Sequence, residues 1–230
     1  MVARTRSSLS RSLLKDQAYA EIKRRIQDET FGAGGFLSER QLAEWLGMSK
    51  TPVKAALERL EQEGFLLVSP QQGIVVRTLT LQEIADQFEL RLALESFVVQ
   101  AIAGQVGTSQ GKRIEKNLQQ QQAAAKAASV PRMVRLDADF HLLLCETLGN
   151  QAIVECLAQH REQMHRVIRQ VMSRERGRLT EAFQEHKSIY REIKRGRAAS
   201  AVSALEKHLQ FGQRALLSSN PPVEPSKVSS

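Results

Sequence analysis

Hydrophobic residues near the start of the chain recur at the spacing of an α-helix. From Leu14 to Ile26 every fourth residue is apolar, which predicts an amphipathic helix that ends before a group of glycines within 32–35. Apolar residues return at helical spacing after Ser38 and again after Ser49. Three helices are therefore expected ahead of Gly64.

The second and third of these segments carry signals for a helix start. The Ser38 hydroxyl can accept a backbone N–H group while Gln41 reaches back, and Gly47 suits the end of the same helix. The next helix opens in the run Ser49-Lys50-Thr51-Pro52, where Ser or Thr can cap the helix. Proline fits a first turn because its missing N–H would be unpaired there. Two such helices joined through a glycine indicate a helix-turn-helix.

After Gly64 the pattern becomes typical of strands. Residues 65–68 and 74–76 are apolar runs, and the turn-forming residues 69–73 separate them. This arrangement predicts a β-hairpin. A helix-turn-helix followed by a hairpin is a winged helix-turn-helix, in which the helix after the turn enters the major groove of DNA.

The rest of the chain has a helical pattern with short breaks, which predicts an antiparallel bundle. The expected helices are 80–104, 108–128, 131–148, 150–175, 179–195 and 198–217. The tract QQQQAAAKAA at 119–128 is interpreted as an ordinary exposed helix.

The predicted fold class is mainly α, with an N-terminal winged helix-turn-helix followed by an all-α antiparallel helical bundle. Composition agrees, since aromatic residues make up only 5% and helix-forming residues dominate. Both chain ends lack a periodic apolar pattern. The expected organisation is a disordered basic arm at 1–11, a winged helix-turn-helix at 12–78, a helical domain at 79–217 and a disordered tail at 218–230.

Charge and cysteine usage narrow the class of partner and the compartment. The net charge of +8 makes nucleic acid or another anionic surface a reasonable partner. Residues 1–78 carry 12 basic and 9 acidic side chains and the remainder 21 and 16, so the excess does not locate a binding surface. Two cysteines are too few for a disulfide framework, and no apolar run suggests export or membrane insertion. We expect a cytoplasmic protein without a membrane partner.

Histidine positions suggest a metal site inside the helical domain. Asp137 and His141 are four residues apart, so both project from one face of a helix and can chelate one ion. His186 and His208 lie on two further predicted helices, at positions expected to face the bundle interior. Three imidazoles and one carboxylate form a plausible site for Zn²⁺, Ni²⁺ or Mn²⁺.

Three other candidates near this set are left out of the metal site. His160 and His165 are five residues apart, which places them on different faces of one helix. Cys145 is one turn beyond His141 and is interpreted as a buried, inert thiol.

The segment GAGGFLSERQLAEWLGMSKTPVKAALERLEQEGFLLVSPQQGIVV closely resembles the DNA-binding domain of the GntR family of bacterial transcription regulators. The resemblance implies that Arg40 meets phosphate or a base and that Lys50, Thr51 and Lys54 present the reading edge. It also places Gly73 at the tip of the wing near the minor groove. The DNA-contacting residues that it implies are Ser38, Glu39, Arg40, Ser49, Lys50, Thr51, Pro52, Lys54 and Gly73.

A second resemblance covers the helical domain. The run from Asp137 to His141, Gly149-Asn150, Glu185-His186 and the stretch ending at His208 look like the C-terminal ligand-binding domain, called FCD, of the FadR-like branch of the GntR family. In metal-binding members an Asp and three His occupy the matching places, which implies that Asp137, His141, His186 and His208 are the metal ligands. The resemblance also assigns Arg91 and Asn150 to effector binding, with the Arg91 guanidinium clamping a carboxylate beside the ion.

Together these patterns predict a homodimeric repressor rather than an enzyme. It would read a double-stranded operator with an inverted repeat, and a small organic acid bound at or beside the metal would change the separation of the DNA-binding units. One alternative is a metal-dependent hydrolase that uses the Asp/His site, although no Glu or His is placed as a general base. A second alternative is an architectural DNA protein, which would show no sequence preference.

Overall fold

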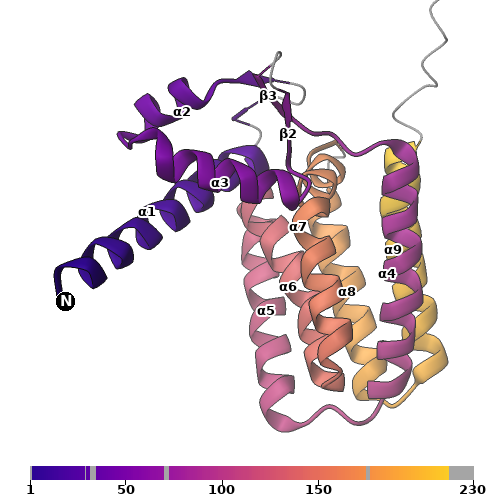
Figure 1. The fold of residues 1–230 in the computed structure, drawn as a ribbon. Coiled ribbons are helices and arrows are strands. Elements are labelled where there is room, and N and C mark those ends of the chain that lie inside the picture. The colour runs from indigo at the N-terminus through magenta and orange to yellow at the C-terminus, as the bar shows by residue number, and fades with distance from the viewer. Residues whose placement is uncertain (1, 29, 32–34, 70–72, 175–176, 218–230) are drawn as a thin grey trace, which may run out of the picture. The chain divides into compact units, whose positions relative to one another are not determined.

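The structure is a computed structural model that describes residues 2–28, 30–31, 35–69, 73–174 and 177–217, with only the backbone described for residues 2–12, 174 and 217. The chain divides into two compact units, Met1–Leu79 and Thr80–Ser230. Each unit is described by itself (Figure 1). The tail at 218–230, expected to be disordered, lies outside the described residues.

The second unit is an all-helical bundle, as the periodicity predicts. Its consecutive helices are joined by short connections and lie alongside one another (Figure 1). They are α4 (Leu81–Ile102), α5 (Thr108–Lys126), α6 (Val130–Leu148), α7 (Gln151–Arg174), α8 (Arg178–Lys194) and α9 (Ala198–Leu217). None of the helices in the described part of the chain combines the length and apolarity needed to cross a membrane.

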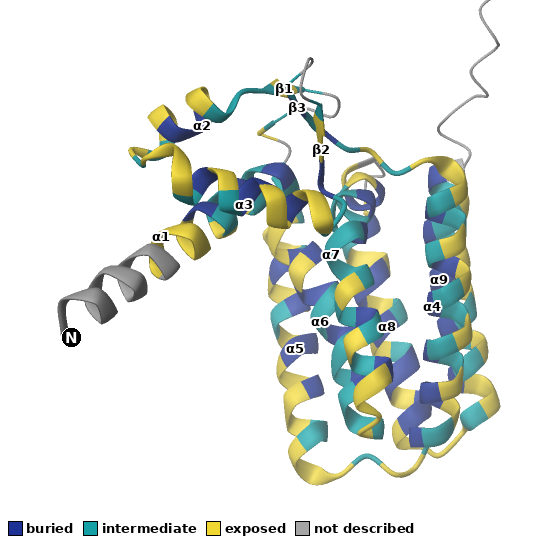
Figure 2. Cartoon of the chain, in the orientation of Figure 1, coloured by how far each residue is buried: buried dark blue, intermediate teal, exposed yellow. Residues whose placement is uncertain are grey.

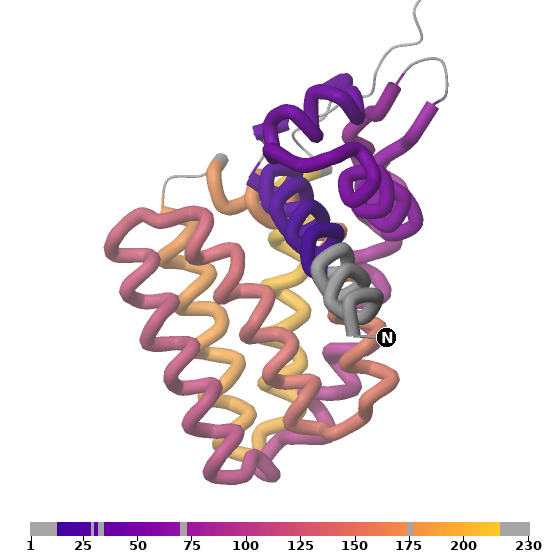
Figure 3. The backbone as a smooth tube through the Cα atoms, turned by 60° about the vertical axis from the view of Figure 1, so that its left-hand side comes forward, coloured from indigo at the N-terminus to yellow at the C-terminus, as the bar shows by residue number. Residues whose placement is uncertain are grey.

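Helices distant in sequence pack together in this bundle. Helix α4 contacts α9 and α6, and α5 contacts α6 and α8. Buried and exposed residues alternate along each helix, as expected when one face packs into a core (Figure 2). The tube view shows the bundle helices side by side from another direction (Figure 3). Side chains from α4, α5, α6, α8 and α9 can therefore meet in the interior.

The first unit is a winged helix-turn-helix. In chain order its elements are α1 (Val2–Gln27), β1 (Phe36–Leu37), α2 (Glu39–Leu46), α3 (Lys50–Gln62), β2 (Leu66–Ser69) and β3 (Gly73–Val76). Helix α1 begins at Val2 and so includes residues 2–11, where the sequence predicts a disordered arm. This stretch contains no proline or glycine that would interrupt a helix that continues into the buried part of α1.

Local signals explain the bounds of α2 and α3. Ser38 caps α2 by accepting the N–H of Gln41 (3.1 Å), and the Gln41 side chain accepts the N–H of Ser38 (3.2 Å), which completes the predicted capping box. Gly47 ends α2 in the left-handed region, with φ of 62°. Ser49 occupies the N-cap position of α3, although its side chain makes no capping hydrogen bond there.

The wing contains a strand that the periodicity does not reveal. The sheet has the order β1-β3-β2, and β1 pairs with β3 through Phe36 opposite Val75 and Leu37 opposite Ile74. Two residues are too few to show an alternating pattern. The register of β2 and β3 agrees with the predicted hairpin, whose turn residues 70–72 lie outside the described part of the chain.

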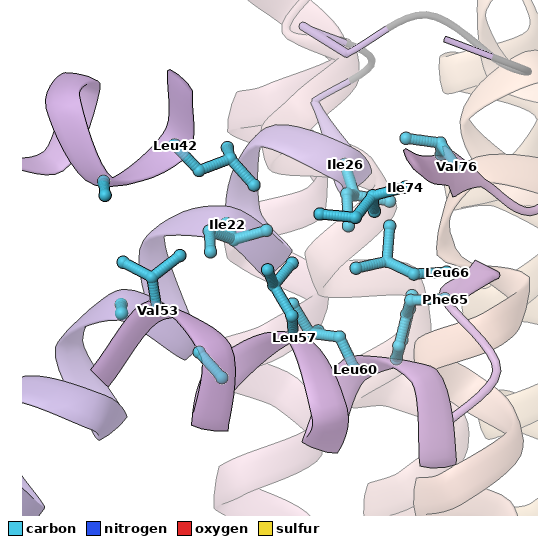
Figure 4. Packing of buried hydrophobic residues seen from close by; sticks show 13 residues of the cluster. Ile22, Ile26, Leu42, Val53, Leu57, Leu60, Phe65, Leu66, Ile74 and Val76 are labelled. Atoms are coloured by element: carbon cyan, nitrogen blue, oxygen red, sulfur yellow. The ribbon is translucent and has the colours of Figure 1, made fainter. Parts of the chain in front are cut away.

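The core of the first unit joins α1 to α3 and the sheet (Figure 4). The fourth-residue pattern of α1 is the buried face, because Ala18, Ile22 and Ile26 are all fully buried. These residues pack with Leu42, Val53, Leu57, Leu60, Phe65, Leu66, Ile74 and Val76. Burial of this apolar surface fixes α3 on α1 and leaves the opposite side of α3 in solvent.

Candidate metal centre and DNA-binding face

Four side chains predicted as metal ligands meet in the interior of the bundle. Asp137 and His141 come from α6, His186 from α8 and His208 from α9, and all four are buried. One ligand atom from each lies within 4.8 Å of the ligand atoms of the others. The four-residue spacing on α6 accounts for the first pair, and the packing of α6, α8 and α9 supplies the other two.

The distances between these atoms suit one shared ion. The Nε2 atom of His208 lies 3.2 Å from Nε2 of His141 and 3.2 Å from Nε2 of His186. The Nε2 atom of His186 lies 3.4 Å from Oδ1 of Asp137. Ligands bound at about 2.1 Å to one transition-metal ion lie about 3 to 4 Å apart, so these separations fit.

Each of the three imidazoles has a separate hydrogen-bond acceptor at its other ring nitrogen. The pairs are His141 Nδ1 with Glu95 Oε2 (2.5 Å), His186 Nδ1 with Gln121 Oε1 (2.8 Å) and His208 Nδ1 with Glu185 Oε2 (2.6 Å). An ionised carboxylate or an amide oxygen can only accept, so each Nδ1 donates its proton. The three Nε2 lone pairs therefore converge on the same point.

The orientation of Gln121 is fixed by a further hydrogen bond. Its Nε2 donates to Oδ1 of Asn117 (2.7 Å), which leaves Oε1 to accept from His186. Gln121 is fully buried, so the interpretation of the tract at 119–128 as an ordinary exposed helix is wrong at this residue. The repetitive composition of this tract gives no sign that one face of α5 packs against α6 and α8.

Two Arg–Glu pairs support the centre through the carboxylates that accept from His141 and His208. Arg91 Nε donates to Glu95 (2.7 Å), and Arg178 makes two hydrogen bonds to Glu185 (2.8 and 2.7 Å). Burial raises the pKa of both carboxyl groups, but the guanidinium and imidazole partners outweigh it and lower each pKa to about 2. Both groups are ionised near neutral pH and hold their imidazoles as Nδ1–H donors.

Two of the three imidazoles favour the neutral form. Burial lowers the pKa of His186 well below its usual value and also lowers the pKa of His208, where the Glu185 hydrogen bond partly opposes it. Neutral imidazoles with unprotonated Nε2 atoms are the form that binds metal. The residues therefore fit a divalent transition-metal ion.

Replacing Glu185 by glutamine should weaken metal binding about tenfold, because the amide still accepts from His208 but no longer supplies its charge. The matched control is Glu192→Gln, because Glu192 is a buried carboxylate on the same helix that pairs with Arg191 (2.9 Å) away from the centre. Competition with a metal-binding dye would measure both affinities. Equal affinities in the two variants would contradict this role for Glu185.

A pocket adjoins the ligand set. Arg91, Asp137 and His141 line it together with residues of α7. Among the lining residues are His160 and His165, which belong to the pocket and not to the four-ligand group. A small molecule held here would touch both Arg91 and the metal ligands.

Two other residues from the sequence analysis lie apart from this pocket. Asn150 is exposed, accepts the N–H of Ile153 (3.3 Å) at the start of α7 and is not among the residues that line this pocket, so its assignment to effector binding stays a prediction. Cys145 is buried and is not one of the four candidate ligands. Burial raises its pKa, which keeps the thiol neutral.

The residues predicted to contact DNA lie on α2, α3 and the wing. Arg40, Lys50, Thr51 and Lys54 are exposed. Arg40 pairs with Glu44 at 3.4 Å and Lys54 with Glu58 at 4.0 Å. Exposed pairs at such distances are weak, so phosphate can compete for both cations.

The remaining residues of this set have roles in the local fold. The Ser38 hydroxyl is used in the capping box, Glu39 lies in the first turn of α2, and Pro52 lies in the first turn of α3. Gly73 has φ of 82°, and a Cβ there would lie 3.2 Å from the carbonyl oxygen of Leu37. Packing within the sheet alone therefore favours glycine at this position.

The sequence analysis missed the residues that surround the metal ligands. The sequence gives a partial signal that Glu95 belongs to the site, because Arg91 lies four residues earlier and can pair with it on the same helix. Glu185 has a partial signal as well, because it directly precedes the ligand His186. Gln121 and Arg178 carry no comparable signal, because only the packing of α5 and α8 against their neighbours brings them to the centre.

Comparison with known families gives matches over both units. Residues 14–76 match the family described as "Bacterial regulatory proteins, gntR family", and residues 86–211 match the FCD domain. The boundary between the two matches falls close to the division between the compact units after Leu79.

Curated relatives cover most of the chain. The HTH-type transcriptional regulator YdhC of Bacillus subtilis is 25% identical over 195 residues, which is 84% of this chain and 86% of that protein. The HTH-type transcriptional repressor RspR of Escherichia coli is 25% identical over 198 residues, 86% of each chain. The gluconate operon transcriptional repressor of Bacillus licheniformis is 25% identical over 181 residues, 79% of this chain and 73% of that protein.

Solved structures support the fold. A transcriptional regulator from Rhodococcus sp. RHA1 has a TM-score of 0.78 at 19% identity, and McbR/YncC of E. coli has a TM-score of 0.75 at 20% identity. Each comparison covers 90% of this chain and 99% of the other. The families and relatives are DNA-binding regulators rather than enzymes.

Proposed function

The chain belongs to the GntR family of bacterial regulatory proteins and carries an FCD domain, and on this premise we propose that it is a homodimeric, metal-dependent repressor. As a regulator of this family it binds operator DNA. Residues 12–78 would read the operator, and residues 79–217 would form the dimer and bind a small carboxylate effector. The site of action would be the bacterial cytoplasm, where the operator lies.

The observation that carries this proposal is the convergence of Asp137, His141, His186 and His208 beside the pocket that Arg91 lines. Zn²⁺, Ni²⁺ or Mn²⁺ would suit three imidazoles and one carboxylate. A bound ion supplies a Lewis-acidic position for an oxygen ligand. Arg91 would hold the same carboxylate through its terminal nitrogens.

The DNA-binding residues are proposed from their placement on the first unit. Lys50, Thr51 and Lys54 would present the reading edge of α3, while Arg40 would contact phosphate or a base from α2. Ser38, Glu39, Ser49 and Pro52 would shape the starts of the two helices. Gly73 would hold the wing close to the minor groove.

A homodimer would match a two-fold symmetric operator with an inverted repeat. One feature that supports association is Phe97 on α4, which is 55% exposed and is the most exposed large apolar side chain on the described bundle. Repression is proposed because relatives such as RspR are described as repressors. Membership in the FadR-like branch is part of the same proposal.

Footprinting on DNA from around the protein's own gene would test the DNA-binding part of the proposal. We expect one protected inverted repeat that persists against excess unrelated DNA at about 0.15 M salt, because sequence-specific contacts survive where phosphate contacts alone are screened. Binding that unrelated DNA removes equally well would support the architectural alternative instead.

A further inference from the structure

We infer that the N-terminal part of α1 is a further DNA-binding surface, which contacts phosphates through a cationic stripe formed by Arg4, Arg11 and Lys15. This surface goes beyond the proposed function, which assigns DNA contacts only to α2, α3 and the wing. Three features of α1 lead to it: the register of the cationic stripe, the direction of α1 beside α3 and the one-sided charge of the segment.

The cationic stripe continues the buried face of α1. At 3.6 residues per turn, Arg4, Arg11 and Lys15 fall within about 20° of the position of Ile22 around the helix axis. Ile22 is the middle one of the three α1 residues that are fully buried in the core. Lys15 is exposed and makes no ion pair with the described residues. One face of α1 is therefore cationic ahead of the core and apolar within it.

Two ion pairs define the direction of α1 relative to α3. Asp16 lies 3.8 Å from Arg59, and Lys23 lies 3.3 Å from Glu63. Because the earlier residue of α1 pairs with the earlier residue of α3, the two helices run in the same sense. The N-terminal part of α1 therefore extends toward the end of α3 that begins at Lys50, and it projects from the rest of this unit (Figure 1).

The position of the cationic stripe suits contact with the DNA that α3 reads. Helix α3 packs on the face of α1 that is centred on Ile22, and DNA with α3 in its groove lies beyond α3 as seen from α1. The cationic stripe is thus on the side of α1 nearest the DNA. About 16 Å of helix separates Arg4 from Lys15, whereas phosphates of one strand are about 3.4 Å apart along the duplex axis. The cationic stripe is long enough to meet more than one phosphate.

The charge of this segment favours an anionic partner over the helix itself. Residues 1–15 contain four basic and no acidic side chains. The positive end of a helix dipole favours acidic residues, and two cations four residues apart, such as Arg11 and Lys15, repel each other. Bound phosphates would remove both penalties. A conflict of this kind between local helix preference and sequence is expected where a segment serves binding.

The same segment provides a matched control for the cationic stripe. Arg6 falls about 160° from Ile22 around the axis, on the opposite face of α1. The full-chain variants Arg11→Gln and Arg6→Gln each remove one positive charge, and glutamine is a good helix former. At about 0.15 M salt, Arg11→Gln should weaken operator binding about fivefold and lower the slope of log affinity against log salt by about one. Arg6→Gln should change the affinity by less than about twofold.

A double variant enlarges the effect and locates the contacts. Arg4→Gln combined with Arg11→Gln should weaken operator binding about twentyfold and lower the salt slope by about two. Fluorescence anisotropy with labelled operator would measure these affinities, and thermal melts would check that each variant is folded. In hydroxyl-radical footprints the double variant should lose backbone protection that the wild type shows, while the protection given by α3 and the wing persists.

Two results would overturn the inference. If Arg6→Gln weakened operator binding as much as Arg11→Gln, net charge and not the cationic stripe would account for the effect. If the double variant kept the affinity, salt slope and footprint of the wild type, the N-terminal part of α1 would not contact the operator.

Discussion

Replacing His186 by alanine is expected to weaken Zn²⁺ binding by at least about a hundredfold, because it removes one of the four ligand atoms. His186 is fully buried, and its ring stacks on Phe140 with centroids 4.3 Å apart. The variant should therefore also lose stability through the cavity that remains. The wild-type protein should gain about 2.7 kcal/mol when free Zn²⁺ is at about 100 times its dissociation constant, and the variant should gain almost nothing.

The matched control for this experiment is His160→Ala. His160 lies in the adjoining pocket and is not one of the four ligands, so its removal should leave Zn²⁺ affinity close to that of the wild type. Elemental analysis and thermal melts with and without Zn²⁺ would measure both variants. Zn²⁺ affinity that falls equally in the two variants, or in neither, would contradict the ligand assignment.

Replacing both Lys50 and Lys54 by alanine is expected to weaken operator binding by about a hundredfold at about 0.15 M salt. Each lysine is exposed on α3, and the ion pair that the Lys54 substitution removes is a 4.0 Å contact with Glu58. If both lysines touch phosphate, the slope of log affinity against log salt should fall by about two. If either reads a base edge, discrimination between operator variants should fall as well.

Fluorescence anisotropy with labelled operator at several salt concentrations would measure these effects. Lys112→Ala is the control, because Lys112 is an exposed lysine on α5 in the other unit and should not contact the operator. The lysine pair would lose its assigned role if the double variant bound the operator as tightly, and with the same salt slope, as Lys112→Ala.

The elements with strong periodic patterns could be predicted from the sequence. The bundle helices agree with the expected segments within a few residues, since glycines and prolines mark their ends. The wing hairpin was predicted from two apolar runs around a turn. Strand β1 was not, because a two-residue strand exists only through its pairing with β3.

The candidate metal site shows a similar limit. The four-residue spacing of Asp137 and His141 is a local property of one helix and is visible in the sequence. The contact of Gln121 with His186 joins residues 65 positions apart and depends on how α5 packs against α8. The orientation of each imidazole follows from such contacts, so the sequence could suggest the ligands but not what orients them.

The same limit applies to the effector residues. Arg91 was placed at the pocket through a resemblance, and the pocket does include it. Asn150 is assigned in the same way, and its side chain also accepts the N–H of Ile153 at the start of α7, as a helix cap does. Its role in effector binding stays a prediction. A helix-start signal alone therefore cannot distinguish a cap from a ligand contact.

The account as a whole requires that the metal centre, the pocket and the DNA-binding unit act together. A coupling of 1 to 3 kcal/mol, typical of allosteric proteins, would change operator affinity by about 5- to 150-fold. The most direct measurement is operator affinity of the full chain with and without hexanoate, in protein loaded with Zn²⁺ and in protein stripped of it. The account predicts that hexanoate weakens operator binding only when Zn²⁺ is present. Operator affinity that does not respond to hexanoate in Zn²⁺-loaded protein, or that responds equally without the metal, would contradict it.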